Sequence, residues 1–89
     1  MKLKDNYTIR EIAGRKVMVP VSVLGGPAAR IVSLSVSSAW LIEQLKDKNF
    51  TAESATDLVC GRYDVERGVA AGDVVNMLEE LRNAGFLDD

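Results

Sequence analysis

Residues 7–21, YTIREIAGRKVMVPV, alternate side chains with a period of two on both sides of a glycine turn. Tyr7 to Ile12 and Lys16 to Val21 are rich in β-branched and aromatic residues, which favours two strands. Gly14 can adopt positive φ between them, so we predict a β-hairpin. Pro20 has no amide N–H and is expected at a strand end or on an unpaired side.

A loop and a third strand are predicted next. Ser22 to Ala29 contains Gly25-Gly26-Pro27, the strongest turn signal in the chain, and predicts a connector. The segment from Arg30 to Leu34 is short and β-branched, which predicts a strand. Its two faces alternate Val32 and Leu34 with Ile31 and Ser33.

The pattern then changes to helical. Ser35 is a good N-cap for a helix over Val36 to Lys48, because its hydroxyl can accept from an unpaired amide of the first turn. The apolar residues of this segment cover most of the circumference, which predicts a central helix with Trp40 in the core. They are Val36, Ala39, Trp40, Leu41, Ile42 and Leu45.

Two further helices are predicted. Thr51 caps a second helix from Ala52 to about Arg62, whose narrow apolar stripe of Ala55, Leu58 and Val59 predicts partial burial. A third helix from about Glu66 to Ala84 carries a stripe roughly 100° wide. Gly85 should end it, with Phe86 and Leu87 folding back onto the stripe. The element order predicts one α+β domain over residues 1–89: a three-stranded antiparallel sheet followed by a three-helix cluster.

Composition limits the function. The chain has 89 residues, 47% hydrophobic and 27% charged, as a single folded domain has. No apolar run approaches the roughly 18 residues of a membrane span, and the N-terminus lacks a signal-peptide core, so we expect a cytoplasmic protein without a membrane partner. Cys60 is the single cysteine and histidine is absent, so we expect no internal disulfide and no metal site. The lack of histidine also disfavours catalysis, although carboxylates could still serve, and we expect no cofactor and no enzyme activity.

Two stretches of the chain, residues 34–40 and residues 63–87, contain motifs that together resemble those of the PqqD family. LSVSSAW at residues 34–40 resembles that family's turn from third strand into first helix. A second set of motifs resembles that family's last helix. It consists of Tyr63-Asp64-Val65 followed by Ala70, Asp73-Val74, Leu78-Glu79-Glu80-Leu81 and Ala84-Gly85-Phe86-Leu87. The resemblance spans nearly the whole chain and implies a winged helix-turn-helix-like fold. It also implies a non-catalytic module that docks the leader of a ribosomally made precursor peptide for a separate enzyme, of the radical-SAM or another maturation type.

Some residues depart from the pattern expected of that family. Ser35 stands where asparagine is common, and Ser37-Ser38 replaces a Thr-Gly type pair. A Gly-Gly-Pro loop also precedes the third strand. These departures indicate a subfamily rather than the quinone-cofactor protein itself.

The exposed edge of a small sheet is a physical basis for peptide binding. Its outward N–H and C=O groups can accept an extended peptide as one more strand. We expect the peptide-binding edge to comprise Arg30, Ile31, Val32, Ser33 and Leu34. A second copy could pair with the same edge, so a homodimer stays open as an alternative.

The resemblance implies a groove between this strand and the last helix. Helical angle alone leaves two flanks of that helix open. One flank comprises Val69, Asp73, Met77 and Glu80, and the other Ala71, Val75 and Arg82. Matching the family's aspartate to Asp73 favours the first flank, although Met77 also suits a core position and Asp73 and Glu80 a solvated face.

Two other function classes are alternatives to peptide binding. A DNA-binding winged-helix regulator is the main alternative, but residues 64–89 carry two basic and seven acidic side chains, and no nucleic-acid partner is expected. An enzyme using Glu79 and Glu80 is disfavoured, because adjacent helix side chains point about 100° apart.

Overall fold

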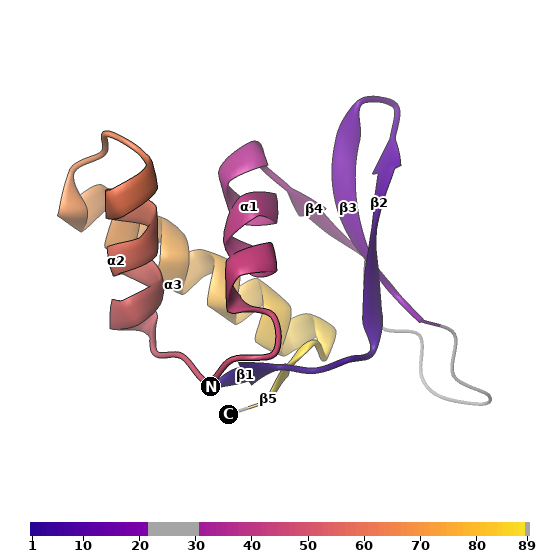
Figure 1. Cartoon of the computed structure of the whole chain (residues 1–89). Coiled ribbons are helices and arrows are strands. Elements are labelled where there is room, and N and C mark those ends of the chain that lie inside the picture. The colour runs from indigo at the N-terminus through magenta and orange to yellow at the C-terminus, as the bar shows by residue number, and fades with distance from the viewer. Residues whose placement is uncertain (22–30, 89) are drawn as a thin grey trace.

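The computed structural model describes residues 1–21 and 31–88. Its elements are β1 (Lys2–Leu3), β2 (Tyr7–Ile12), β3 (Arg15–Pro20), β4 (Val32–Leu34), α1 (Val36–Leu45), α2 (Ala52–Arg62), α3 (Arg67–Ala84) and β5 (Leu87–Asp88). Strands β2, β3 and β4 form an antiparallel sheet in that order, which stands beside the helices (Figure 1). The predicted α+β class, with a three-stranded sheet and three helices, is confirmed.

The hairpin β2–β3 turns over two residues. Ala13 and Gly14 both have positive φ, at 52° and 80°, as the favoured two-residue hairpin turn requires. Pro20 is the last residue of β3, opposite Tyr7, so its expected place at a strand end is confirmed. Strand β3 runs from Arg15 to Pro20, one residue earlier than predicted.

The third predicted strand is shorter than expected. Strand β4 begins at Val32, and Ile31 precedes it with its side chain 64% exposed. Arg30 and the predicted connector at residues 22–29 lie outside the described residues. Within the described residues, Val32 to Leu34 pair antiparallel with residues 16–18 of β3, and this pairing sets the length of β4.

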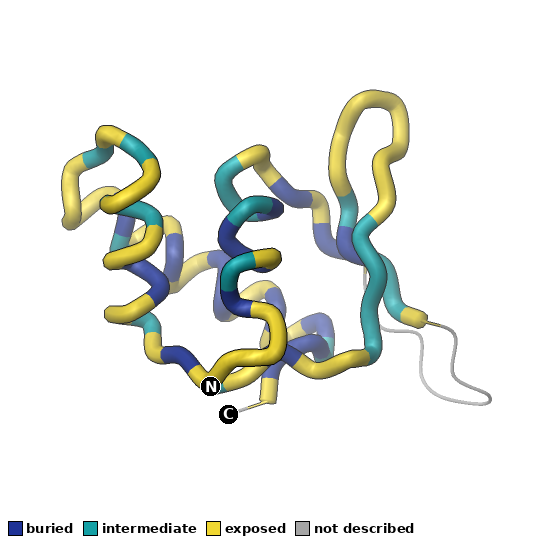
Figure 2. Tube along the Cα trace, in the orientation of Figure 1, coloured by how far each residue is buried: buried dark blue, intermediate teal, exposed yellow. Residues whose placement is uncertain are grey.

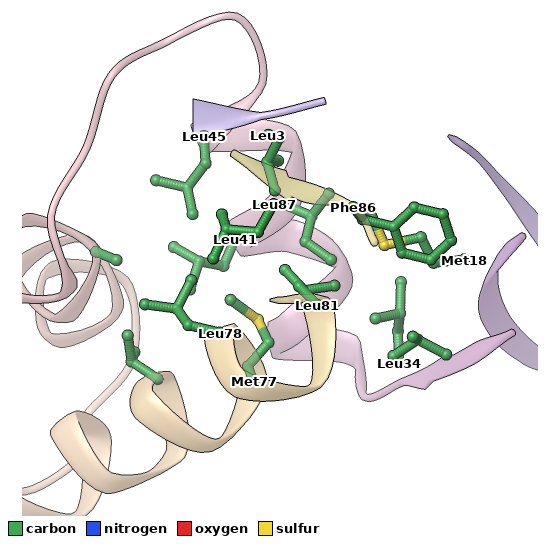
Figure 3. Packing of buried hydrophobic residues seen from close by; sticks show 14 of the residues in the cluster. Leu3, Met18, Leu34, Leu41, Leu45, Met77, Leu78, Leu81, Phe86 and Leu87 are labelled. Atoms are coloured by element: carbon green, nitrogen blue, oxygen red, sulfur yellow. The ribbon is translucent and has the colours of Figure 1, made fainter. Parts of the chain in front are cut away.

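One face of the sheet enters the core. Met18, Val32 and Leu34 are buried together, and Phe86 comes from beyond α3 to lie beside Met18 (Figure 3). The predicted shared face of Val32 and Leu34 is therefore correct. The close-packed interior means that β4 is held between the β3 ladder and apolar side chains from the helices.

Helix α1 begins at the predicted cap, where the Ser38 N–H donates to Ser35 Oγ at 3.1 Å. It ends at Leu45 rather than Lys48, because the chain turns back through Asp47, at φ 62°, and buries Phe50. Val36, predicted on the buried surface, is 83% exposed in the first turn.

Trp40, predicted to be core, is only half-buried. Its ring makes an edge-to-face contact with Tyr63, the two centroids 5.8 Å apart, and the Arg62 guanidinium lies 6.0 Å from its centroid. The buried residues of α1 are instead Ala39, Leu41, Ile42 and Leu45. Figure 2 shows buried and exposed positions alternating along this helix. Helical periodicity alone had not separated Trp40 from these buried residues.

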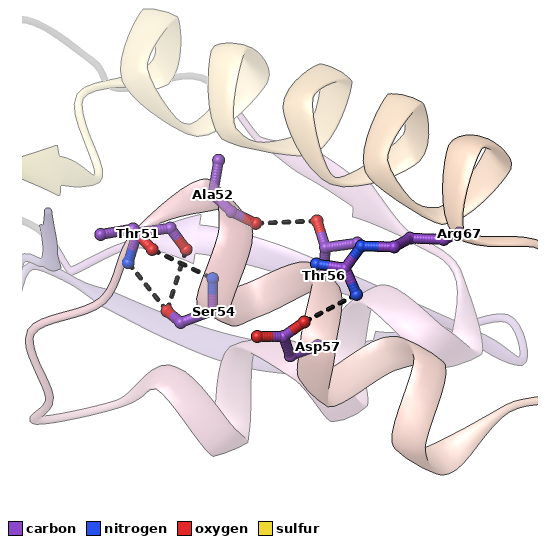
Figure 4. A network of polar contacts seen from close by, with 6 residues as sticks. All are labelled: Thr51, Ala52, Ser54, Thr56, Asp57 and Arg67. Atoms are coloured by element: carbon purple, nitrogen blue, oxygen red, sulfur yellow. Dashed lines mark hydrogen bonds and ion pairs between the residues drawn. The ribbon is translucent and has the colours of Figure 1, made fainter.

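Helix α2 has the predicted bounds and a stronger start than the sequence indicated. Thr51 and Ser54 form a capping box, with Ser54 N–H donating to Thr51 Oγ1 at 3.0 Å and Thr51 N–H to Ser54 Oγ at 2.9 Å (Figure 4). The helix is partly buried, as predicted: Ala55 is buried and Val59 packs against the core, whereas Leu58 is 38% exposed and Thr56 is buried instead.

An exposed ion pair connects α2 to the start of α3. Arg67 Nη1 lies 2.7 Å from Asp57 Oδ1 (Figure 4). The hydrogen bond to Asp57, with the attraction of its charge, raises the pKa of the Arg67 guanidinium. Both side chains are more than half exposed, so the pair contributes little to the stability of the fold.

Helix α3 ends as predicted. Gly85 is left-handed at φ 86°, and the N–H of Phe86 donates to the Leu81 carbonyl at 2.9 Å. Phe86 and Leu87 are buried, which confirms that they fold back. At the other end, the helix begins at Arg67 with Glu66 as its N-cap.

The chain ends form a second sheet that the sequence analysis missed. β1 and β5 pair antiparallel, with Leu3 opposite Leu87. The Phe50 N–H donates to the Met1 carbonyl at 2.8 Å, and the Met1 amino group donates to the Phe50 carbonyl at 2.9 Å. Two-residue strands have no measurable periodicity, so pattern analysis had no signal for them. Within the described ranges, none of the helices has the length and apolar character needed to cross a membrane.

Candidate functional site

Strand β4 lies at an edge of the three-stranded sheet. Within residues 1–21 and 31–88 it has a strand neighbour on one side, β3, and none on the other. Its backbone orientation follows from the hairpin, where the Val21 N–H donates to the Asn6 carbonyl at 2.9 Å. Because antiparallel strands alternate, Val17 and Val19 direct their backbone groups to β2, and Lys16 and Met18 direct theirs to β4.

The same alternation fixes which residue of β4 presents its backbone outward. Leu34 stands opposite Lys16 and Val32 stands opposite Met18, so both direct their N–H and C=O groups toward β3. Ser33, between them, directs its N–H and C=O away from the sheet. Its side chain is exposed, whereas Val32 and Leu34 are buried.

A groove runs beside this edge, between β4 and α3. It has a volume of about 470 Å³ and continues into an adjoining hollow of about 340 Å³. The residues that line the first part, here called the β4–α3 groove, are Val32, Ser33, Leu34, Ser35, Ser37, Ser38, Asp73, Asn76, Met77 and Glu80. The adjoining hollow adds Ile31, Asn83 and Ala84.

The groove has an apolar floor and polar walls. Val32, Leu34 and Met77 are each at most 7% exposed and form the floor. Asp73 and Glu80 extend exposed carboxylates from α3 along one wall. An extended chain lying here can bury an apolar side chain on the floor and place basic side chains against that wall.

The opposite end of the groove is the start of α1. Ser35 Oγ lies 3.0 Å from Ser38 Oγ and 3.2 Å from Ser37 Oγ, so three hydroxyls gather there. The first turn of α1 contains no acidic residue. The positive end of the helix dipole therefore has no acidic partner within the first turn of α1, and Asp73 of α3 lines the same part of the groove as Ser37 and Ser38.

The structure brings most of the predicted site residues together. Those that line the β4–α3 groove or its adjoining hollow are Ile31, Val32, Ser33, Leu34, Asp73, Met77 and Glu80. Val69 is 53% exposed and lies outside both, and Arg30 is outside the described residues. Met77 belongs to the core and also lines the groove, so its two proposed roles coexist.

The alternative flank of α3 faces elsewhere. Ala71, Val75 and Arg82 line neither part of the groove. The structure therefore places the flank containing Asp73 beside β4.

Several lining residues were missed from the sequence. Asn76 and Asn83 each follow a predicted lining residue by three positions, a spacing that puts them on the same helical face. Ser37 and Ser38 were noted only for their departure from a family pattern. Their position in the first turn after the Ser35 cap was a usable signal, since such side chains surround the helix N-terminus.

A comparison with family models matches residues 21–87 to PqqD, described as coenzyme PQQ synthesis protein D. The chain belongs to the PqqD family. In fold, this PqqD-family chain is similar to the solved structure titled "TbiB1 in Complex with the TbiA(beta) Leader Peptide", with a TM-score of 0.66 and 22% identity over 99% of this chain and 100% of that chain. A search of curated proteins found no match. The predicted family resemblance is confirmed.

Proposed function

We propose that this chain binds the leader segment of a ribosomally made precursor peptide by strand addition to β4. The observation that carries the proposal is the outward backbone of Ser33 at a strand edge that adjoins an apolar-floored groove. Membership of the PqqD family supports it. The similar fold of TbiB1, a protein solved with a leader peptide, is consistent with it.

The groove divides the recognition between main chain and side chains. A leader residue opposite Ser33 exchanges backbone hydrogen bonds with it, which provides affinity without selecting sequence. Successive side chains of the extended leader point alternately toward and away from the groove floor, so an apolar leader side chain can reach Met77 and Leu34. Asp73 and Glu80 favour basic leader residues along the α3 wall, and the hydroxyls at the start of α1 can hydrogen-bond a polar one.

The proposed role is non-catalytic. The bound leader is presented in the cytoplasm to a separate modifying enzyme, of the radical-SAM or another maturation type. The alternative of a DNA-binding regulator has no structural support in α3, whose exposed surface carries Asp73, Glu79 and Glu80. Among the described residues, no three histidine, cysteine or carboxylate side chains are grouped to hold a metal ion.

The test is an amide titration followed by NMR. Synthetic leaders of short precursor genes encoded beside the gene for this chain are added to isotope-labelled protein. We expect the amides of Ser33 and of residues 73–80 to shift, and hydrogen exchange at the Ser33 amide to slow as it gains a partner. Shifts confined to residues 22–29 would contradict the proposal. Salt-dependent binding of a random DNA duplex at micromolar protein would instead favour the regulator.

A further inference from the structure

A second groove lies on the other side of the hairpin, between β2 and α1. Its volume is about 400 Å³. The residues that line it are Asp5, Tyr7, Thr8, Ile9, Ile42, Glu43 and Lys46. Figure 1 shows α1 standing beside the hairpin, with β2 as the strand opposite β4 across the sheet. We call this hollow the β2–α1 groove.

Strand β2 also presents backbone groups outward. Thr8, Arg10 and Ile12 direct theirs to β3, by the alternation that the Val21–Asn6 hydrogen bond sets. The backbones of Tyr7, Ile9 and Glu11 therefore face away from β3, and no strand of the described chain covers them. Two of these three residues, Tyr7 and Ile9, also line the groove.

The floor of the β2–α1 groove is apolar and packs against the core. Ile42 of α1 is fully buried, and Ile9 packs against the core beside it. The Tyr7 ring meets Phe86 edge to face, the two centroids 6.0 Å apart. A strand added to β2 would thus pair with a backbone whose inner side chains are already fixed.

The groove is electronegative at its Tyr7 end. Asp5 and Glu43 line it, against a single basic lining residue, Lys46, in the described chain. Burial raises the pKa of Tyr7, and the negative charges of Asp47 and Asp5 raise it further, so both carboxylates act on the position of the phenol oxygen. The potential at this end of the groove is therefore negative, which favours a cation there.

We propose that the β2–α1 groove binds an extended segment of a partner protein that carries lysine or arginine, added to β2 as a strand. The outward backbones of Tyr7, Ile9 and Glu11 provide the pairing, and Asp5, Glu43 and Asp47 select the charge. Because β2 and β4 are opposite edges of one sheet, this segment and a peptide on β4 occupy separate sites.

A second copy of the chain fits this edge poorly. Two β2 strands paired antiparallel about Ile9 would set Glu11 of one copy opposite Tyr7 of the other. That carboxylate would then stand near Asp5 and Asp47, and like charges in such positions are destabilising. The charge of the groove therefore selects a basic partner over the chain itself.

The test uses a defined probe, a short peptide of alternating lysine and valine, titrated into isotope-labelled protein at low salt. We expect the amides of Tyr7, Ile9 and Glu11 and of residues 42–46 to shift while Ser33 stays unchanged. The same peptide with glutamate in place of lysine should not bind. Glu43→Lys should weaken lysine-peptide binding about fivefold, and the exposed control Glu79→Lys, on α3, should leave it unchanged.

Each contrary result overturns the proposal. Equal binding of the glutamate peptide would remove the role of charge, and shifts confined to Ser33 and residues 73–80 would place the probe on β4. An absence of binding by either peptide would show that the edge accepts no strand. Shifts of Tyr7 and Ile9 that follow protein concentration alone, with a doubled mass in solution, would assign the groove to a second copy. None of these results depends on a leader, so the proposed function is judged separately.

Discussion

The two edges of the sheet offer a strand partner different surroundings. Strand β2 is six residues long and directs three backbones outward, whereas β4 is three residues long and directs only Ser33 outward. The longer edge is lined by charges, including Glu43 and Lys46. The shorter edge has an uncharged serine above a floor of buried Val32, Leu34 and Met77.

The proposed leader site is therefore at the shorter of the two edges, and what distinguishes the edges is the charge around them. Natural proteins guard exposed edges with charged side chains, which make pairing selective. On that criterion β2 carries a guarding charge within the strand, at Glu11, whereas the charges beside β4, Asp73 and Glu80, stand on α3. We expect affinity at β4 to depend on the groove beside the single outward backbone, and affinity at β2 to depend on the charge of the partner.

The largest expected effect comes from a core substitution that destabilises both edges of the sheet. Phe86 is fully buried and joins Tyr7 of β2 to the core that supports β4. Phe86→Ala should lower the free energy of unfolding by about 3–5 kcal/mol, because it leaves a cavity in a close-packed interior. Denaturant unfolding followed by Trp40 fluorescence measures this. The control Ile12→Ala, at a side chain 56% exposed, should change stability by less than about 0.5 kcal/mol.

A proline substitution on each edge strand tests which edge binds the leader. Ser33→Pro removes the outward N–H of β4 without breaking the β3 ladder, and should weaken leader binding by about tenfold or more. Glu11→Pro makes the matched change on β2 and should leave leader binding intact. Calorimetric titration of both variants decides the matter. Equal loss in the two variants would show that the leader does not use β4 selectively.

Charge reversal should act more weakly. Glu80 lies in the wall of the β4–α3 groove and of the hollow that continues it. Glu80→Lys should weaken binding of a leader with basic side chains about fivefold at low salt, and the loss should shrink as salt is added. Glu43→Lys, in the other groove, should not affect the leader. If both variants weaken the leader alike, the effect is one of net charge.

The smallest effect concerns Tyr7 and pH. Because the pKa of Tyr7 is raised in the folded state, that state retains the proton more strongly than the unfolded chain. The contribution of Tyr7 to the free energy of unfolding is therefore constant at pH values below the ordinary tyrosine pKa of 10.0, and it falls as pH rises above that value. Tyr7→Phe should reduce this decline in urea unfolding measured at stepwise pH. An unchanged decline in Tyr7→Phe would show that Tyr7 contributes nothing to it.

Part of the candidate site was predictable because it depends on local periodicity. Val32 and Leu34 share a face by the period of two, and Asp73, Met77 and Glu80 share a flank by helical angle. Val69 satisfied the same angle but lies outside the groove. Angle describes a direction around the helix and says nothing of how far along it the strand reaches.

The β2–α1 groove was not predictable in this way. It joins residues 5–9 to residues 42–46, which are brought together only when α1 packs beside the hairpin. The pairing of β1 with β5 is of the same kind, since it connects Leu3 to Leu87. Contacts between distant segments leave no repeat in the sequence.

The sequence by itself determined the hairpin, the caps at Ser35 and Thr51, the stop at Gly85 and the acidic character of the last helix. Each depends on interactions within a few residues, which composition and spacing encode directly. Only the tertiary structure decided that Trp40 is half-buried, that the flank with Asp73 faces β4, and that two grooves lie beside opposite edges of the sheet. These follow from how apolar faces of separate elements share one interior, which no single element specifies.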